Sequence, residues 1–270
     1  MAKGEELFCS VAIQLLNPHT QGKVGGFMVD KAVLERFKAE GITIPMITLA
    51  DVISNNVLKK GYGDKTFIYF EDERVSYRQF YEKSLLYAHL FLKKKRFQDR
   101  PFNVGVLMDN YPEFIYSFGG CAFAGAGLVG LNTVQKGSML ARDINFTDCQ
   151  VLVTETKYLQ EVMGIRSQLE NISENEILVN NFRDESRDLP ANISSLEDSL
   201  LHLERELGQT AKQPPGTQVT PDHLQMIIFT SGSTGTPKGI INSHLNLIIR
   251  GFMVAARLQL TPSDVCYGVM

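Results

Sequence analysis

A short run of small hydroxyl and glycine residues that ends in a lysine is the part of this sequence best suited to chemistry. Residues 230–239 read TSGSTGTPKG. Glycine lets backbone N–H groups converge on a ligand, serine and threonine hydroxyls donate hydrogen bonds, and lysine supplies positive charge. These properties suit a loop that holds a polyphosphate. A flexible Ser/Gly linker has a similar composition, but it requires neither a preceding strand nor a following Pro-Lys-Gly.

The elements that position this loop can be identified on both sides of it. The apolar run from Leu224 to Phe229 has the length and composition of a buried strand. Downstream, Ser243 is placed to cap a helix that runs from Leu245 to Leu258. The sequence therefore predicts a strand, then the loop, then a helix.

The loop differs from the Walker phosphate loop, because Pro237 precedes Lys238 where that pattern requires glycine. It resembles, position for position, the phosphate-loop signature of the adenylate-forming superfamily. That signature is commonly written as an aromatic or apolar residue followed by TSG(S/T)TGxPKG, and Phe229 is the first residue here. The superfamily contains the acyl- and aryl-CoA synthetases, the adenylation domains of peptide synthetases, and the beetle luciferases.

Three upstream segments resemble the same superfamily. Residues 64–80 are similar to its "D…A…F…(T/S)Y.EL" pattern, residues 104–114 to "V.(I/L)…N.PEF", and residues 124–132 to "GA…LN". The resemblance covers approximately residues 46–270. It implies the N-terminal portion of an adenylate-forming large domain, with an α/β fold.

The resemblance also implies a reaction and a set of site residues. Such enzymes join a carboxylate to ATP, release pyrophosphate, and pass the acyl group from AMP to a thiol. Lys238 is the expected catalytic residue, because it would neutralise the charge of the departing pyrophosphate. The residues expected to bind the phosphates are Thr230, Ser231, Gly232, Ser233, Thr234, Gly235 and Lys238.

The implied small molecules are ATP with Mg²⁺, CoA as co-substrate, and a carboxylic acid. The general character of residues 64–135 favours a ligase for a fatty or other aliphatic acid, and so a role in fatty acid metabolism. The alternatives are a peptide-synthetase adenylation domain and a non-catalytic nucleotide-binding α/β module. The superfamily's adenine, magnesium and ribose contacts and its C-terminal lysine lie downstream of the matching segments. We therefore expect no metal ligand in this chain and a C-terminal half beyond it.

Composition argues against nucleic acid as a partner and against disulfide bonds or a metal site. Lysine and arginine total 27 against 30 aspartates and glutamates, a net charge of −3 that does not favour nucleic acid. The four cysteines (Cys9, Cys121, Cys149 and Cys266) form no CxxC pair, so we expect reduced core thiols and a cytoplasmic protein. The five histidines lack metal-ligand spacing, and His244, near the loop, is expected to be solvated or to cap a helix.

Strand and helix patterns alternate from residue 104 to residue 207, which predicts mostly parallel sheets flanked by helices. The expected strands are 104–108, 128–131, 151–154 and 177–179. Four helices are expected: one starts at Pro112, and the others cover 139–145, 157–169 and 196–207. Thr48 with Asp51, and Ser76 with Gln79, form capping boxes for two earlier helices, and 66–70 with Val75 forms a hairpin.

The expected domain organisation has three parts. Residues 1–45 form an N-terminal extension with a charged helical piece around 29–40. Residues 46–208 form an α/β subdomain. Residues 209–270 contain a Pro/Gly-rich linker and the phosphate-loop unit of a second, truncated subdomain.

Three further segments permit alternative interpretations. Residues 125–130 satisfy GxGxxG, but a helix precedes these glycines and a strand follows, the reverse of a dinucleotide loop, so close helix–sheet packing is expected. The uncharged stretch 114–134 is long enough to span a membrane, yet its glycines favour a buried helix that turns into a strand. The basic run 93–96 favours a helix C-terminus over a nuclear signal.

Overall fold

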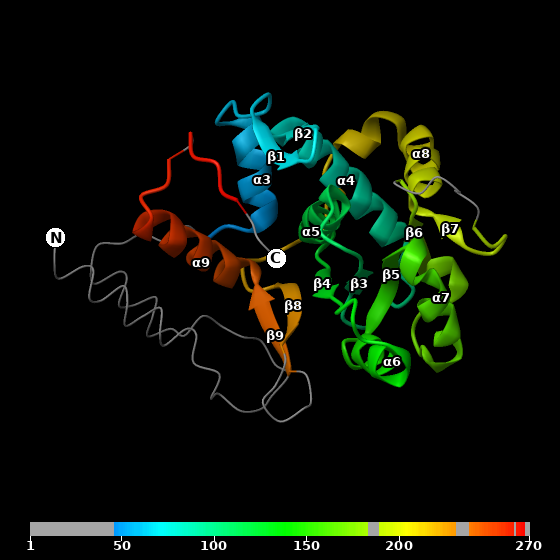
Figure 1. Cartoon of the computed structure of the whole chain (residues 1–270). Helices are drawn as coiled ribbons and strands as arrows, with labels where there is room; N and C mark the ends of the chain where they lie inside the picture. The colour runs from blue at the N-terminus through cyan, green and yellow to red at the C-terminus, as the bar shows by residue number, and fades with distance from the viewer. Residues whose placement is uncertain (1–45, 183–188, 231–237, 262, 268–270) are drawn as a thin grey trace.

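The computed structural model describes residues 46–182, 189–230, 238–261 and 263–267, and Figure 1 shows their arrangement. A seven-stranded sheet lies at the centre. Its strands, in spatial order, are β7 (Ser194–Ser195), β6 (Ile177–Asn180), β5 (Cys149–Glu155), β3 (Asn103–Leu107), β4 (Gly127–Gly130), β8 (Leu224–Thr230) and β9 (Lys238–Ser243). Every neighbouring pair is parallel except β8 and β9, which are antiparallel. The predicted α/β class with a mostly parallel sheet is confirmed.

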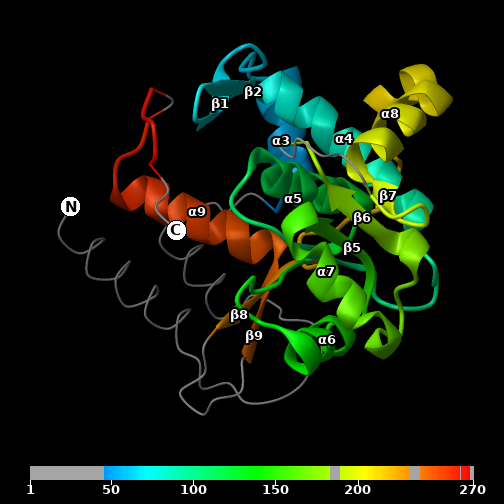
Figure 2. The same cartoon turned by 45° about the vertical axis from the view of Figure 1, so that its right-hand side comes forward.

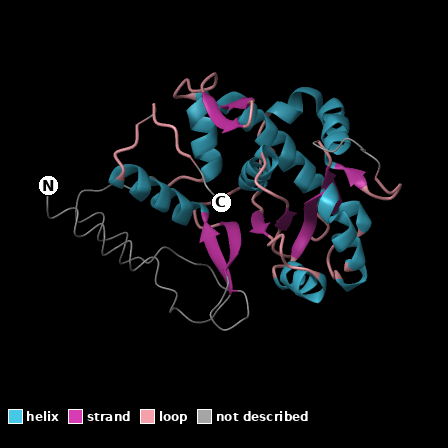
Figure 3. Ribbon diagram, in the orientation of Figure 1, coloured by secondary structure: helices cyan, strands magenta, loops and turns pink. Residues whose placement is uncertain are grey.

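Helices cover both faces of this sheet, as Figures 1 and 2 show. They are α3 (Leu49–Leu58), α4 (Tyr77–Lys94), α5 (Pro112–Ala124), α6 (Gly137–Phe146), α7 (Thr156–Gly164), α8 (Leu196–Leu207) and α9 (His244–Arg257). A separate hairpin is made by β1 (Thr66–Phe70) and β2 (Glu73–Ser76), and Figure 3 distinguishes its strands from the surrounding helices.

The apolar core has two halves, one on each face of the sheet. Val151 and Val153 of β5 pack with residues of α3, α4, α5 and α8, whereas Leu152 packs with α6 and α7. Strands that are buried on both faces are continuous hydrophobic runs, which explains the sequence of β5.

Local sequence signals position the helix starts as predicted. The Thr48 amide donates to Asp51 Oδ2 at 2.8 Å, and the Asp51 amide donates back to Thr48 Oγ1 at 3.1 Å. Ser76 and Gln79 make the same reciprocal pair at the start of α4. Pro112 occupies the first turn of α5, where its missing N–H costs nothing.

Two elements differ from the prediction. The helix expected over 157–169 ends at Gly164, and a separate 3₁₀ turn covers Arg166–Gln168. The sequence analysis also missed β9, which separates the loop from α9. The adjacent β-branched residues Ile240 and Ile241 were the signal for this strand.

The glycines of the GxGxxG segment have structural roles. Gly125 ends α5 with φ at +64°, and Gly127 begins β4, so the inverted order of helix and strand is confirmed. The expected helix–sheet contact at Gly127 is wrong. A Cβ at Gly127 would lie 2.5 Å from Asn103 Oδ1 of β3 and 2.7 Å from Leu224 Cδ2 of β8. The glycine therefore leaves room for side chains of the two neighbouring strands.

The uncharged stretch 114–134 forms most of α5 and all of β4, as expected. Within the described ranges, no helix is long and apolar enough to cross a membrane. Cys121 and Cys149 are buried thiols, and burial raises the pKa of Cys149 to about 12. Cys266 is exposed, so the prediction of a core thiol is wrong there; it follows α9 in a segment with little packing. Cys9 lies outside the described residues.

The phosphate-loop strand belongs to the same sheet as the preceding α/β region, because β8 pairs with β4 through Leu128 and Met226. A 3₁₀ helix, Gly208–Lys212, begins the segment expected to be a linker. The expected boundary between two subdomains, at residues 208 and 209, stays a prediction. The expected N-terminal extension, residues 1–45, lies outside the described part.

Candidate nucleotide-binding site

The ends of the phosphate-loop segment meet across an antiparallel pair of strands. Ile228 lies opposite Ile240, Phe229 opposite Gly239, and Thr230 opposite Lys238. Two of the predicted site residues, Thr230 and Lys238, are therefore cross-strand neighbours, and Lys238 is exposed. Ser231, Gly232, Ser233, Thr234 and Gly235 lie outside the described residues, so their roles stay predictions.

The sheet orients this hairpin. Because β8 is parallel to β4, its carboxyl end lies at the same edge of the sheet as the carboxyl ends of β3, β4 and β5. Open α/β sheets bind ligands beyond the carboxyl ends of their strands. The loop sequence thus leaves the sheet at the edge where ligands of this architecture bind.

A charged network occupies the same edge beyond β3 and β5. Asp109 forms an ion pair with Lys157, and the Tyr158 hydroxyl donates to Asp109 Oδ1 at 2.7 Å. The Asp109 amide donates to Glu155, whose carboxylate also lies 3.3 Å from Lys157 Nζ. We call Asp109, Glu155, Lys157 and Tyr158 the strand-end network.

The network shifts the pKa values of its members. The hydrogen bond from Lys157, followed by that from Tyr158, lowers the pKa of Asp109. Burial raises the pKa of Glu155. Burial alone would lower the pKa of Lys157, but hydrogen bonds to the two carboxylates outweigh it and raise that pKa. Asp109 and Lys157 are therefore both charged at neutral pH.

Sequence analysis did not identify this network. Asp109 and Lys157 are 48 positions apart, and only their places just after predicted strands could have suggested proximity. Neighbouring strands are ~4.8 Å apart, so the network lies two to three strand spacings, ~10–15 Å, from β8. The network and the carboxyl end of β8 therefore lie at the same edge of the sheet.

His244 is not part of this edge. It begins α9 at the opposite end of β9 from Lys238, and six strand residues span ~17 Å. Its side chain is fully buried, and Nδ1 accepts a hydrogen bond from the Leu49 amide at 3.1 Å. Burial lowers its pKa to about 4. The solvated alternative is wrong, whereas the capping alternative is confirmed in part: the neutral imidazole accepts a hydrogen bond from the first amide of α3 and so joins α9 to the start of that helix.

Ser243 has its predicted role, since its Oγ accepts from the Asn246 amide at 3.2 Å in the first turn of α9. The helix after the loop therefore begins where the sequence indicated. Nε2 of His244 has no hydrogen-bond partner among the described residues.

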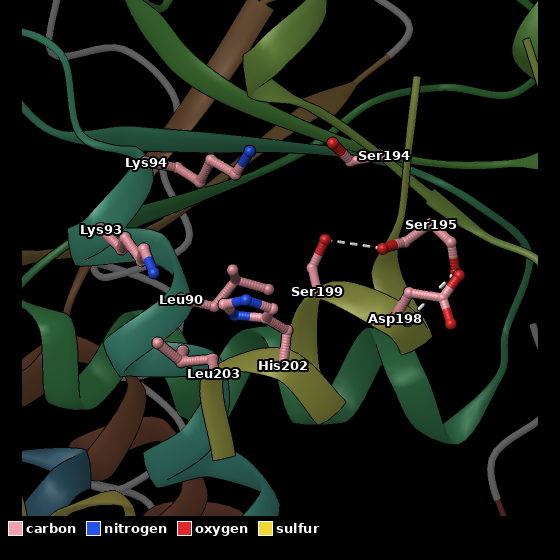
Figure 4. A pocket seen from close by; sticks show the side chains of 9 residues that line it. All are labelled: Leu90, Lys93, Lys94, Ser194, Ser195, Asp198, Ser199, His202 and Leu203. Atoms are coloured by element: carbon pink, nitrogen blue, oxygen red, sulfur yellow. Dashed lines mark hydrogen bonds between the residues drawn. The ribbon is translucent and has the colours of Figure 1, made fainter. Parts of the chain in front are cut away.

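The basic run at the end of α4 lines a shallow cavity of about 320 Å³ between α4 and α8, which Figure 4 shows. Lys93 pairs with Glu206 at 2.5 Å, and Lys94 donates to the Asn175 carbonyl at 2.6 Å. Both lysines lie in the last turn of α4, as the helix-terminus interpretation expected. The cavity adjoins β7, at the other end of the strand order from β8, so it is separate from the candidate nucleotide site.

The described ranges contain no group of three or more histidine, cysteine, aspartate or glutamate side chains that could hold a metal ion. The strand-end network does not form such a group, because the Lys157 ammonium lies between its two carboxylates.

A mostly parallel sheet, with a glycine- and hydroxyl-rich sequence between the paired strands β8 and β9, is an architecture typical of nucleotide-binding α/β proteins. The family described as AMP-binding enzyme matches residues 56–270. This chain belongs to that family.

Named relatives agree with this assignment. The chain is 32% identical over 176 residues to a steroid-22-oyl-CoA synthetase of Rhodococcus jostii, with 64% of this chain and 28% of the relative covered. It is 30% identical to the medium/long-chain-fatty-acid–CoA ligase FadD17 of Mycobacterium marinum, with 77% of this chain and 36% of the relative covered. The chain thus spans about a third of the length of these relatives.

Solved structures share the fold. A putative long-chain-fatty-acid CoA ligase from Rhodopseudomonas palustris superimposes with a TM-score of 0.66 at 22% identity, covering 82% of this chain and 51% of that protein.

Proposed function

We propose that this chain provides the phosphate-binding part of an enzyme that activates a carboxylic acid with ATP and transfers it to CoA. The observation that carries the proposal is the β8–β9 hairpin, in which Thr230 and Lys238 lie opposite each other at the carboxyl edge of a parallel sheet. Membership of the AMP-binding enzyme family supports it.

The chemistry explains why such a loop is needed. A substrate carboxylate oxygen attacks the α-phosphorus of ATP, the bond from that phosphorus to the bridging oxygen breaks, and pyrophosphate leaves. The CoA thiol then attacks the acyl carbonyl, AMP leaves, and the thiol proton passes to solvent or a base. Negative charge grows on the β- and γ-phosphates in the first step, so fixed donors and a cation beside them lower its barrier.

Each loop residue has a proposed role in that step. Lys238 neutralises the departing pyrophosphate, and the hydroxyl or backbone groups of Thr230, Ser231, Ser233 and Thr234 bind phosphate oxygens. Gly232 and Gly235 let the backbone approach. Mg²⁺ would arrive bound to ATP and add charge neutralisation. Among the described residues, no group of three or more histidine, cysteine, aspartate or glutamate side chains could hold that ion.

The substrate class is proposed from the relatives. One relative is named for a steroid-22-oyl group and the other for medium- and long-chain fatty acids, and both names include CoA. We infer a fatty or other aliphatic carboxylic acid as substrate and CoA as acceptor.

The test is Lys238→Ala in a catalytically complete protein that contains residues 1–270, assayed by carboxylate-dependent ATP–pyrophosphate exchange. Loss of one electrostatic donor is expected to slow exchange by ~10²-fold. Lys212→Ala, which removes an exposed lysine of the 3₁₀ turn, is the matched control and should leave the rate unchanged. An unchanged rate in Lys238→Ala would show that Lys238 is only a surface charge.

A further inference from the structure

The connection between β4 and α6 lies beside the strand that leads into the phosphate loop. β4 is parallel to β8, and Gly130 is the partner of Ile228 in that register. Continued for two residues, the same register brings Asn132 level with Thr230, at the ~4.8 Å spacing of neighbouring strands. We call residues 132–136 the β4–α6 loop.

Two hydrogen bonds inside the β4–α6 loop form a turn. The Val134 amide donates to Asn132 Oδ1 and the Gln135 amide donates to the Asn132 carbonyl, both at 3.0 Å. Helix α6 then begins without a side-chain cap, because the residue before it is Lys136 and a lysine side chain has no acceptor. The first amides of a helix have no partner inside it, so the start of α6 needs an acceptor from another element.

Helix α7 supplies this acceptor and a second contact. Glu161 accepts a hydrogen bond at 2.7 Å from the amide of Gly137, the first residue of α6. A carboxylate at a helix N-terminus is also favoured by the helix dipole. Tyr158 lies three residues before Glu161, on the same side of α7, and its hydroxyl forms a hydrogen bond with the side chain of Thr133 in the loop. One helix therefore holds the loop near its start and just after its end.

The strand-end network fixes Tyr158 in turn. The Tyr158 hydroxyl donates to Asp109 Oδ1 at 2.7 Å, and Asp109 is paired with Lys157. The Lys157 ammonium also lies 4.9 Å from the centre of the Tyr158 ring. Because Asp109 follows β3 and Tyr158 follows β5, these contacts tie the loop after β4 to the ends of two other strands of the sheet.

We propose that Tyr158 and Glu161 are positioning residues of the nucleotide site, which hold the β4–α6 loop as a fixed wall next to the phosphate-loop strand. The inference rests on the proposed function, because the wall has this role only if the phosphates of ATP bind beyond Thr230. A loop that is already ordered loses little conformational entropy when ATP binds beside it, so the two side chains strengthen ATP binding without touching the nucleotide.

Carboxylate-dependent ATP–pyrophosphate exchange by a catalytically complete protein that contains residues 1–270 tests the inference. Tyr158→Phe keeps the ring beside Lys157 and removes the hydroxyl. The KM for ATP is expected to rise ~3- to 10-fold, the usual effect of losing one hydrogen bond, while the KM for the carboxylic acid stays within about twofold. A purely structural role would instead reduce the amount of folded enzyme, and so the apparent kcat, with both KM values unchanged.

Two substitutions at Glu161 form a matched pair. Glu161→Ala removes the acceptor of the Gly137 amide and should raise the KM for ATP as Tyr158→Phe does. Glu161→Gln keeps a side-chain oxygen that can accept from that amide, so it should hold the KM within about twofold of the original value. Tyr69→Phe removes the hydroxyl of an exposed tyrosine of β1 and is the control for loss of a hydroxyl; it should change neither KM.

Deuterium uptake by the same proteins measures the loop itself and needs no activity. Peptides that cover residues 132–137 should take up deuterium faster in Tyr158→Phe and in Glu161→Ala than in the original protein, because loss of a contact lets the loop open locally. Glu161→Gln should match the original protein in these peptides. Peptides from α8 should show equal uptake in every variant.

The outcomes separate this inference from the proposed function. If Lys238→Ala slows pyrophosphate exchange but Tyr158→Phe and Glu161→Ala leave the KM for ATP unchanged, the positioning role is wrong and the proposed function stands. Equal deuterium uptake by the loop in all variants would also overturn the positioning role. If the original protein catalyses no carboxylate-dependent exchange, the proposed function fails and this inference fails with it.

Discussion

The buried imidazole of His244 makes a prediction about stability and pH. The side chain is fully buried and accepts a hydrogen bond from the Leu49 amide through Nδ1. Burial is the main cause that lowers its pKa to about 4, nearby His223 contributes, and Asp51 opposes. In the unfolded chain the imidazole has a pKa of ~6.5, so the unfolded state binds the proton more readily than the folded state.

The magnitude follows from that difference. Stability from the neutral imidazole is fully present above about pH 6.5 and is lost as pH falls towards 4. A shift of ~2.5 pKa units corresponds to ~3 kcal/mol in total, of which ~2 kcal/mol is lost by pH 5. This is a large fraction of the ~5–15 kcal/mol that stabilises a typical domain.

The assay is urea unfolding between pH 7 and pH 5, with His244→Asn as the comparison. Asparagine keeps an acceptor for the Leu49 amide but does not titrate, and the other ionisable groups contribute equally to both proteins. The free energy of unfolding of the original chain should fall by ~2 kcal/mol more than that of the variant over this range. Parallel pH profiles for the two proteins would refute the assignment of the titration to His244.

Two further predictions concern strand packing and activity. Gly127→Val should lower the free energy of unfolding by ~1–3 kcal/mol or more, because a Cβ there would lie 2.5 Å from Asn103 Oδ1 and 2.7 Å from Leu224 Cδ2. Thermal unfolding measures this change. Gly164→Val is the steric control, because a Cβ at Gly164 meets nothing within 4 Å. If NADH protected the original chain against heat and did not protect Gly127→Val, the dinucleotide interpretation would be restored. Residues 1–270 alone should form no acyl-adenylate, because the hairpin and Lys238 supply contacts only to the phosphates. Release of AMP from ATP by the purified chain with any carboxylic acid would contradict that.

Hydrogen bonds between residues close in the sequence could be predicted from the sequence. The capping pairs Thr48 with Asp51 and Ser76 with Gln79 join residues three positions apart, so helical geometry alone brings them together. The phosphate-loop signature is likewise contiguous in residues 230–239, because one loop must supply all the groups that hold the phosphates. The parallel sheet followed from the alternation of strand and helix patterns.

Only the tertiary structure decided contacts between distant segments. Asp109 meets Lys157 because β3 and β5 are neighbours in the sheet, and His244 meets Leu49 across 195 positions because α9 packs beside α3. The same packing makes His244 buried, leaves Cys266 exposed, and sets Gly127 between two strands rather than beneath a helix. Spacing along the chain determines partners within about one helical turn; beyond that, the order of the strands determines which side chains are close enough to interact.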